Sequence, residues 1–578
     1  MKRSASPSAH NNPGHGNPGA SPEKVRRILR WLTPLWVALT GILVGLASPH
    51  ARVPLLWIVA FVPLLLALDL TAPIYRGGWP GRRFWLPALG CTAPAGVLFA
   101  AVIGGWITNT AHVYGGFPTY LALLANWLGY GAFFIGEFFF FLGVPFVLTR
   151  HRPWLALAVV PLWVTVFQLY VPRFLFFTYG QLMDSVLPLP QFADILGSGG
   201  PNLLYMALQL VLFYWLRSLY APRSFAIKPL AWASGALVVS FVTAYGYGTW
   251  QMARWSERQA AGKQVELVGI QPNFSLKHLA SNPDRSLADR RQSFSALIND
   301  SNKALARARR DPGTPVVVVW PESVYPRPYY FNQPMRNAVE RWARRSGVEM
   351  ILTSQHYRMG VGKRSRRDRK LFGVSIHLGP GGKPAGMYRK IALIPFGESV
   401  PLGDWFPFFR RFVLNSLPNF SEFTPGEEYT VFTLANGVKV APMICYDIID
   451  HFVARGMARN GARLGIVMAN MAWFGRSTVS DQMSWMVRFR AIENRMPILF
   501  LSQSGKSYLI DATGRDVIPR LGQFVTGSIV HTVGVPESGS FYSANGAWFH
   551  AGYLLLLLGA LGAAWWRGLF SRSAKGDQ

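Results

Sequence analysis

The stretch VVVVWPES at residues 316–323 indicates what kind of fold the polar part of this chain adopts. Four consecutive valines have no polar face, so the strand that they predict must be buried on both sides. Trp320 and Pro321 end this strand, and Glu322 follows them. A carboxylate at the end of a buried strand is costly unless it is paired or takes part in chemistry. Taken alone, Glu322 is better explained as an acidic residue in the first turn of a helix.

The sequence around this stretch alternates between strand-like and helix-like segments from residue 264 to residue 535. Further strands are predicted at 265–270, 348–353, 372–378, 438–444, 465–470 and 498–502, and helices at 284–310 and 480–495. This alternation predicts an α/β domain whose apolar strands are covered by other layers.

Two more strand ends carry reactive side chains. Lys390 stands in YRK at 388–390, shortly before IPFGE at 394–398, and Cys445 stands in APMICYD at 441–447. Separately, Lys390 could be a surface cation and Cys445 a small core residue. Together with Glu322 they form a chemically complete set, because a carboxylate can deprotonate a thiol and an ammonium group can stabilise the oxyanion that forms when the thiolate attacks an acyl carbon. The sequence therefore predicts Glu322 as general base, Lys390 as electrophilic stabiliser and Cys445 as nucleophile.

The rest of the chain is unusually apolar. Of 578 residues, 50% are hydrophobic and only 15% are charged, whereas a soluble domain is nearer ~25% charged. A helix needs about 20 residues to cross the hydrocarbon core of a bilayer. We expect eight spans, at 31–48, 53–72, 84–107, 119–148, 153–171, 201–219, 229–250 and 548–566.

The loop charges orient these spans. Arginine and lysine are concentrated in every second loop, for example at Arg82 and Arg83 and at Arg150 and Arg152. The positive-inside rule then places the segment before the last span outside the cytoplasm. The expected domains are a disordered cytoplasmic tail, a seven-span membrane domain, an extracytoplasmic catalytic domain, an eighth span and a second cytoplasmic tail, at 1–27, 28–250, 251–541, 542–566 and 567–578.

Composition also argues against other classes of protein. The formal net charge is +30, but the densest basic run, Lys363 to Lys370, has no aromatic residues among its charges, so nucleic acid is not an expected partner. The two cysteines cannot form a disulfide framework. We expect no metal, because the polar domain has no cluster of His, Cys and Asp at ligand spacing.

Glu322, Lys390 and Cys445, within WPES, YRK and ICYD, resemble the Glu-Lys-Cys triad of the nitrilase, or carbon-nitrogen hydrolase, superfamily. Insertion of such a domain before the last of eight spans is similar to one membrane branch, the apolipoprotein N-acyltransferases. Other stretches resemble that branch in order along the chain: YGQ at 179–181, FADILG at 192–197, IPFGE at 394–398, Asn470 with WFG at 473–475, and RFRAIE at 488–493.

The resemblance implies an α-β-β-α sandwich on the periplasmic side of the bacterial inner membrane. It implies an acyltransferase without a cofactor that moves an acyl chain from a phospholipid, through a thioester on Cys445, to the α-amine of the diacylglyceryl-cysteine of a lipoprotein. Supporting roles fall to Glu398, Tyr446 and Asp447, and the expected substrate-pocket residues are Asn470, Trp473 and Phe474.

Two other functions stay open. Asp447 stands where this family usually has glutamate, as in soluble nitrilase-type hydrolases, and the family's lid tryptophan is missing near His278. These differences favour a membrane-tethered amidase in which water resolves the thioester. The other open function is that of a non-catalytic relative that acts as an assembly or transfer factor in the membrane.

Overall fold

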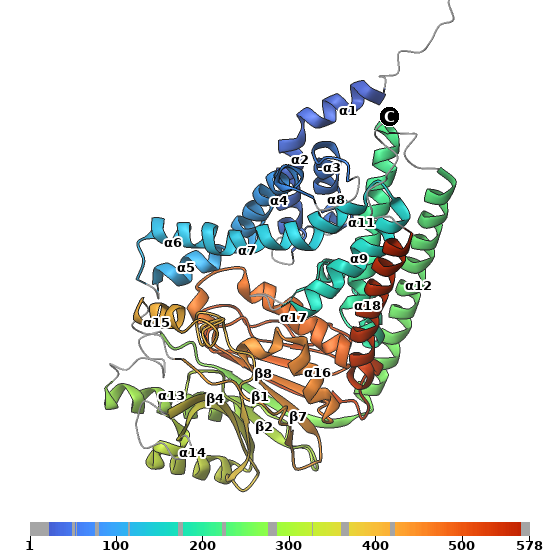
Figure 1. Cartoon of the computed structure of the whole chain (residues 1–578). Coiled ribbons are helices and arrows are strands. Elements are labelled where there is room, and N and C mark those ends of the chain that lie inside the picture. The colour runs from blue at the N-terminus through green and yellow to red at the C-terminus, as the bar shows by residue number, and fades with distance from the viewer. Residues whose placement is uncertain are drawn as a thin grey trace, which may run out of the picture.

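The computed structural model describes residues 22–567 apart from 49–52, 54, 76–79, 114–115, 172–176, 222–226, 276–285, 326–327, 360–368 and 417–421. A helical bundle forms one half of the molecule, and two β-sheets with their covering helices form the other (Figure 1). The fold class predicted from the sequence, a polytopic helical membrane protein with an inserted nitrilase-like sandwich, is confirmed in this architecture.

The inserted domain contains one six-stranded and one five-stranded sheet, with strand orders β11-β1-β2-β3-β4-β5 and β10-β9-β8-β7-β6. The strands of the first sheet are β1 (Lys263–Gln271), β2 (Val316–Val319), β3 (Glu349–Met359), β4 (Arg369–Leu378), β5 (Pro384–Arg389) and β11 (Gly527–Val535). Those of the second are β6 (Phe432–Thr433), β7 (Lys439–Ile444), β8 (Leu464–Ala469), β9 (Ile498–Ser502) and β10 (Tyr508–Ile510). All seven predicted strands are present.

Parallel pairing in the centre of each sheet brings strand ends together. β1, β2 and β3 are parallel, and so are β7, β8 and β9, whereas the outer strands run antiparallel. β1 begins the domain, and β11 pairs with it in antiparallel register from Lys263–Val535 to Gln271–Gly527. The two ends of the domain therefore meet on adjacent strands.

The four valines of β2 are apolar without alternation because both faces of this strand are buried. Val317 and Val319 belong to the core that includes the residues between the sheets, and Val316 and Val318 pack instead in a second core with residues of α13 (Leu287–Leu305) and α14 (Gln333–Ser346). Successive side chains of a strand point to opposite faces, so both faces must be apolar when both are covered.

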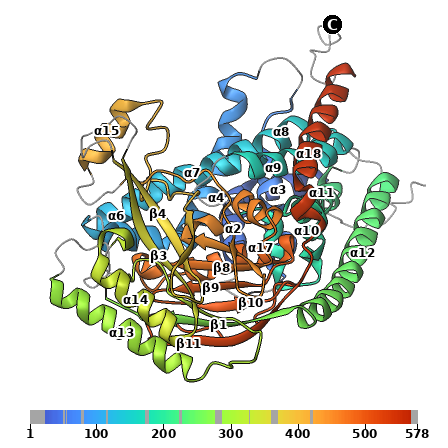
Figure 2. The ribbon, with the colours of Figure 1, turned by 90° about the horizontal axis from the view of Figure 1, so that it is seen from below.

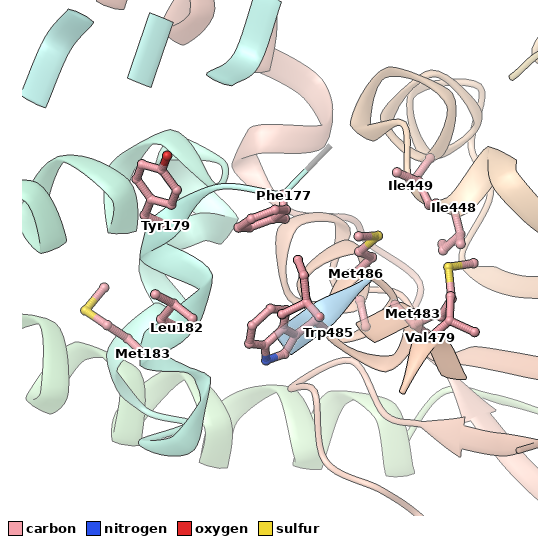
Figure 3. Packing of buried hydrophobic residues seen from close by; sticks show 14 of the residues in the cluster. Phe177, Tyr179, Leu182, Met183, Ile448, Ile449, Val479, Met483, Trp485 and Met486 are labelled. Carbon is pink, nitrogen blue, oxygen red and sulfur yellow. The ribbon is translucent and has the colours of Figure 1, made fainter. Parts of the chain in front are cut away.

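α16 (His451–Arg459) and α17 (Val479–Asn494) pack on strands of the five-stranded sheet and lie toward the bundle (Figure 1), and Figure 2 shows α17 beside β9 and β10. α17 packs on the turn after β7 and on the membrane-side segment around 177–183. Figure 3 shows Phe177 and Leu182 of that segment on the side facing Trp485 of α17, and the Phe177 and Trp485 rings lie 6.3 Å apart. An apolar core thus continues from the bundle to the five-stranded sheet.

Six helices of the described chain are long and apolar enough to cross a membrane. They are α4 (Arg82–Ile103), the continuous helical stretch Thr119–Thr149, α9 (Pro153–Tyr170), α11 (Gly199–Tyr220), α12 (Ile227–Ala260) and α18 (Phe541–Trp566). Each overlaps a predicted span. α12 is longer than predicted and continues nearly to β1, because its polar second half leaves the bundle and packs on the domain.

The first two predicted spans differ from expectation. The span expected at 31–48 is a pair, α1 (Pro22–Trp31) and α2 (Thr33–Leu46), bent by 62° at Leu32, and it gives a seventh span only if the pair is counted as one. The span expected at 53–72 is a shorter apolar segment, Leu56–Thr71, whose first turn is 3₁₀ and whose second part is α3 (Val62–Thr71). Among the described residues, six helices are long enough to span singly where eight spans were expected, because hydropathy detects neither the bend at Leu32 nor the shortness of Leu56–Thr71.

The predicted disordered tail is also corrected in part. Residues 22–27 belong to α1, whose Val25 and Leu29 pack against Leu66, Leu70 and Tyr220. The many charged residues of this segment suggested disorder. Two apolar residues four positions apart lie on one face of a helix, however, and this face is enough to pack α1 against the bundle. Residues 1–21 of that tail and 568–578 of the second tail lie outside the described residues.

Candidate active site

The three predicted catalytic side chains lie together where strands of the two sheets end. Glu322 follows β2, Lys390 follows β5, and Cys445 follows β7. Cys445 opens the 3₁₀ turn Cys445–Ile448 with a φ of 49°, in the left-handed region that non-glycine residues rarely occupy. Such backbone strain persists only where the surrounding structure enforces it, and it concentrates at functional sites.

Lys390 is almost completely buried between two carboxylates. Its Nζ donates to Glu398 Oε1 at 2.6 Å and lies 3.8 Å from Glu322 Oε1. The second oxygen of Glu398 accepts the backbone N–H of Ile394 at 2.9 Å. Glu398 thus fixes Lys390 and closes its own loop, and the longer contact leaves the Glu322 carboxylate less tightly held.

Glu322 also contacts the thiol. It is hydrogen-bonded to Cys445, and its Oε2 accepts the backbone N–H of Asn470 at 3.0 Å. The same N–H interacts with the Cys445 sulfur. A carboxylate, a thiol and a lysine therefore share one small space.

The surroundings adjust the proton affinity of each group. Burial raises the pKa of Glu322 to about 7, an effect that the Lys390 ammonium partly opposes. Burial and the Glu322 charge raise the pKa of Cys445 well above its usual value. Burial alone would lower the pKa of Lys390, but Glu398 and Glu322 outweigh it and raise that pKa. At neutral pH the lysine is therefore charged, the cysteine is a thiol, and Glu322 is balanced between its two forms.

Asp447 supports the loop that carries Lys390. Its Oδ1 accepts the backbone N–H groups of Ile391 and Ala392, at 3.1 and 2.8 Å, and its Oδ2 accepts the Tyr388 hydroxyl at 2.9 Å. Oδ2 also accepts the N–H of Ile444. Burial raises the pKa of Asp447 to about 6, while Lys390 and these donors oppose the rise. Tyr388 was not singled out from the sequence, although it stands in the YRK stretch.

A pocket opens beside the triad. Its wall includes Glu322, Lys390 and Glu398 and, from other elements, the residues Ser323, Tyr325, Pro328, Thr353, Ser354, Gln355, Gly373, Val374, Phe423 and Ile444. None of these ten was predicted as a pocket residue. Ser323 and Ile444 stand in the WPES and ICYD stretches but carry no group that the proposed chemistry needs, and the other eight come from loops and strands without such a motif.

The predicted pocket residues lie partly elsewhere. Asn470 is at the site through its backbone, and its Oδ1 accepts the N–H of Ala472. The backbone carbonyl of Trp473 accepts a hydrogen bond from the Thr110 hydroxyl, and the ring centre of Phe474 lies 5.2 Å from that of Trp106. Both Thr110 and Trp106 belong to α5 (Gly105–Val113) of the bundle, so the WFG segment connects the site to the membrane helices.

Tyr446 is buried directly after the cysteine. His278 is outside the described residues. In the part of the chain that the structure describes, no three His, Cys, Asp or Glu side chains are grouped so that they could hold a metal ion.

This chain is similar to carbon-nitrogen hydrolases in its second half and to apolipoprotein N-acyltransferases over most of its length. Residues 283–541 match the carbon-nitrogen hydrolase family. An apolipoprotein N-acyltransferase of Geobacter metallireducens is 28% identical over 528 residues, covering 89% of this chain and 91% of the relative. One from Chlorobaculum tepidum is 26% identical and covers 82% and 86%. Among solved structures, an amidase from Nesterenkonia sp. AN1 is 15% identical, covers 50% of this chain and 99% of its own, and has a TM-score of 0.35.

Proposed function

The chain is a divergent relative of the apolipoprotein N-acyltransferases with a carbon-nitrogen hydrolase domain, and we propose that it transfers an acyl chain from a membrane phospholipid to the α-amine of a lipoprotein's diacylglyceryl-cysteine. The family and the enzyme class predicted from the sequence are confirmed by these relatives. The observation that carries the mechanism is the contact of Glu322 with both Cys445 and Lys390.

In the first step, Glu322 takes the proton of the Cys445 thiol while the sulfur attacks the ester carbon of the phospholipid. Negative charge develops on the ester oxygen, and the Lys390 ammonium stabilises it. The tetrahedral species collapses to a thioester, and the lysophospholipid alkoxide leaves with the proton that Glu322 holds. Because the cysteine is a thiol at neutral pH, the base is required.

In the second step, the free amine of the lipoprotein attacks the thioester carbon. Glu322, again a carboxylate, accepts a proton from the amine, and the Cys445 thiolate leaves and is reprotonated. The amide product has one acyl chain more than the acceptor. Glu398 and Asp447 take no part in bond making; they hold Lys390 and its loop through the contacts described above.

Access for lipids supports a membrane substrate. The WFG segment beside Asn470 contacts α5, and the apolar core of Figure 3 links the Cys445 turn with the bundle. We expect a diacyl lipid of the adjoining leaflet to approach the thiol along this junction. We place the domain on the periplasmic side of the inner membrane, and the loop charges support this orientation.

The test separates transfer from hydrolysis. Purified protein given phospholipid alone should release one burst of lysophospholipid and retain an acyl group on Cys445. A diacylglyceryl-cysteine peptide with a free α-amine should discharge this acyl group into N-acyl peptide, and an N-acetylated peptide should not. Steady release of free fatty acid, unchanged by either peptide, would establish the amidase-like alternative instead.

The orientation has its own test. A reporter enzyme fused after Ser540 should be active outside the cytoplasm, and one fused after Lys228 should be active inside. The opposite result for Ser540 would place the site on the cytoplasmic face and exclude a periplasmic acceptor.

A further inference from the structure

α1 carries an excess of positive charge at the end of the bundle away from the sheets (Figure 1). Its sequence, PEKVRRILRW, has four basic side chains and a single acid, Glu23. Three of the basic side chains, Arg26, Arg27 and Arg30, are exposed, and we refer to them as the three arginines of α1. Their guanidinium groups are open to a partner outside the protein.

The end of the bundle under α1 adds to this excess of positive charge. Arg26 interacts electrostatically with His151, which is exposed in the loop before α9. Nη2 of Arg217 lies 2.8 Å from Nδ1 of His151. The carboxylate of this region, Asp69, is already shared by Arg150 and Arg217. The surface that α1 forms with this end of the bundle therefore favours an anionic partner.

The apolar face of α1 is wider than the area that the bundle covers. Val25 and Leu29, one turn apart, pack on the bundle. Ile28, three residues after Val25, is 50% exposed, and Trp31, three residues after Ile28, is 83% exposed. Residues three or four positions apart are neighbours on a helix, so these four side chains form one strip, half of which faces away from the protein. The three arginines of α1 lie on the opposite side of the helix.

A bend stabilised by side chains sets the direction of α1. Pro34 has no N–H to donate to the Arg30 carbonyl, as a continuous helix would require. The Thr33 hydroxyl donates to that carbonyl instead, at 2.8 Å, and the Trp36 indole donates to the carbonyl of Leu29 at 3.0 Å. These hydrogen bonds satisfy carbonyls at the end of α1. α1 therefore lies at 62° to α2 and does not continue its path.

We propose that α1 lies in the headgroup layer of the leaflet at this end of the bundle and binds anionic phospholipids there, with its three arginines at the phosphates and with Ile28 and Trp31 against the acyl chains. A helix with a basic polar face and with tryptophan on its apolar face is typical of segments that lie in the plane of a membrane interface. This binding requires that the bundle spans a membrane, not that the triad transfers acyl groups. Only the naming of this leaflet as the cytoplasmic one rests on the proposed orientation.

The test follows one labelled position on each side of α1 in the full-length chain. Cys91 and Cys445, both buried, are replaced by Cys91→Ala and Cys445→Ser. A polarity-sensitive nitrobenzoxadiazole label is then attached to a cysteine introduced by Ile28→Cys, on the apolar strip, or by Glu23→Cys, on the polar side. The protein is placed in nanodiscs of phosphatidylcholine, or of an equimolar mixture with phosphatidylglycerol, and quenching by neutral acrylamide is measured.

Anionic lipid should bury the first label and leave the second in water. A basic residue near an anionic surface contributes about 1 kcal/mol, or about a fivefold change in an equilibrium. Quenching of the Ile28→Cys label should therefore fall by about fivefold or more when phosphatidylglycerol is present. Equal quenching of this label in the two lipids would overturn the proposal and leave a protein or a nucleic acid as the partner of the basic surface. An equal fall at Glu23→Cys would overturn the assignment of the two faces.

Two triple variants, both carrying the Ile28→Cys label, test the charge. The first changes the three arginines of α1, as Arg26→Gln, Arg27→Gln and Arg30→Gln, and should abolish the difference between the lipids. The second makes the same change in net charge at exposed positions of α14, as Arg341→Gln, Arg344→Gln and Arg345→Gln, and should preserve the difference. A difference that survives in both variants, or is lost in both, overturns recognition by α1.

Salt gives a measurement that does not depend on how the triple variants fold. At about 1 M ionic strength the screening length is about 3 Å, so the protein that keeps its arginines should lose most of the difference between the two lipids. Return to low salt should restore this difference. A difference that persists at high salt would overturn attraction between the arginines and the lipid phosphates.

Discussion

Two buried clusters of charge in this protein use similar groups in opposite ways. At the site, one lysine stands between two carboxylates, Glu398 at 2.6 Å and Glu322 at 3.8 Å. In the bundle, α3 lies on the side away from the sheets (Figure 1) and carries one carboxylate, Asp69, which stands between two arginines, Arg150 at 3.2 Å and Arg217 at 3.1 Å. The first cluster has an excess of acid and the second an excess of base.

The clusters differ in how their groups are hydrogen-bonded. Arg150 also donates to the carbonyls of Ala72, Pro73 and Val147, and Asp69 accepts the Tyr220 hydroxyl. These contacts tie α3 to the ends of neighbouring helices and offer no reactive group. At the site, by contrast, Glu322 meets a thiol that can give up its proton. Buried charged groups in this protein therefore either stabilise helix packing or take part in a reaction. Their hydrogen-bond partners show which of the two roles a cluster has.

The largest effect is expected from Cys445→Ser. A serine hydroxyl has too high a pKa for a base adjusted to a thiol, so acyl transfer should fall by about 10⁴-fold or more. Lysophospholipid release and acyl-enzyme formation measure this loss. Cys91→Ala is the matched control, because Cys91 is the second cysteine and lies buried in α4; it should retain activity. Equal loss in both variants would point to a structural role for the thiols.

Glu322→Gln removes the base and keeps the shape of the side chain. The burst of lysophospholipid should slow by about 10²- to 10⁴-fold, the usual contribution of general base catalysis. Single-turnover kinetics measure it. A variant with a normal burst that fails only to discharge the acyl group would restrict Glu322 to the second step.

Asp69→Asn tests the cluster in the bundle. It leaves two buried arginines without their counter-charge, and breaking such a pair should lower the free energy of unfolding by about 3–5 kcal/mol. Thermal unfolding in detergent measures this change, and Glu257→Gln, at an exposed position of α12, is the control. The activity per folded molecule should stay near that of the parent. A specific loss of turnover at unchanged stability would contradict the architectural role.

The smallest effect is expected from pH. Burial raises the pKa of Glu322 to about 7, so the carboxylate form that acts as base is lost as the pH falls below that value. The rate of acyl-enzyme formation should level off above pH 8 and decrease to about a tenth of that level near pH 6. Stopped-flow measurement across pH 5–8 tests this. A rate that stays flat down to pH 5 would mean that burial does not raise this pKa.

Much of the sandwich could be predicted from local sequence. Strands β2, β7 and β9 are largely apolar runs. Glu322 follows the first of them and Cys445 the second, and apolar burial does not explain either residue. A strand of four valines is buried in any fold, because no other environment accepts both faces. The sequence also indicated that a polytopic bundle flanks the domain, since hydropathy over about 20 residues is a local property.

Other features depended on contacts between residues distant in sequence. β11 pairs with β1 from the opposite end of the domain sequence, and the Asn470 N–H donates to Glu322, which follows a strand of the other sheet. Arg455 packs against Gly546 on the last helix. The bend between α1 and α2 likewise has no signal in hydropathy. The sequence by itself determined which groups can react and which segments are buried, because residue type and periodicity are local. Only the tertiary structure decided the distances among those groups and the pKa values that follow from them, because both depend on which distant segments exclude water together.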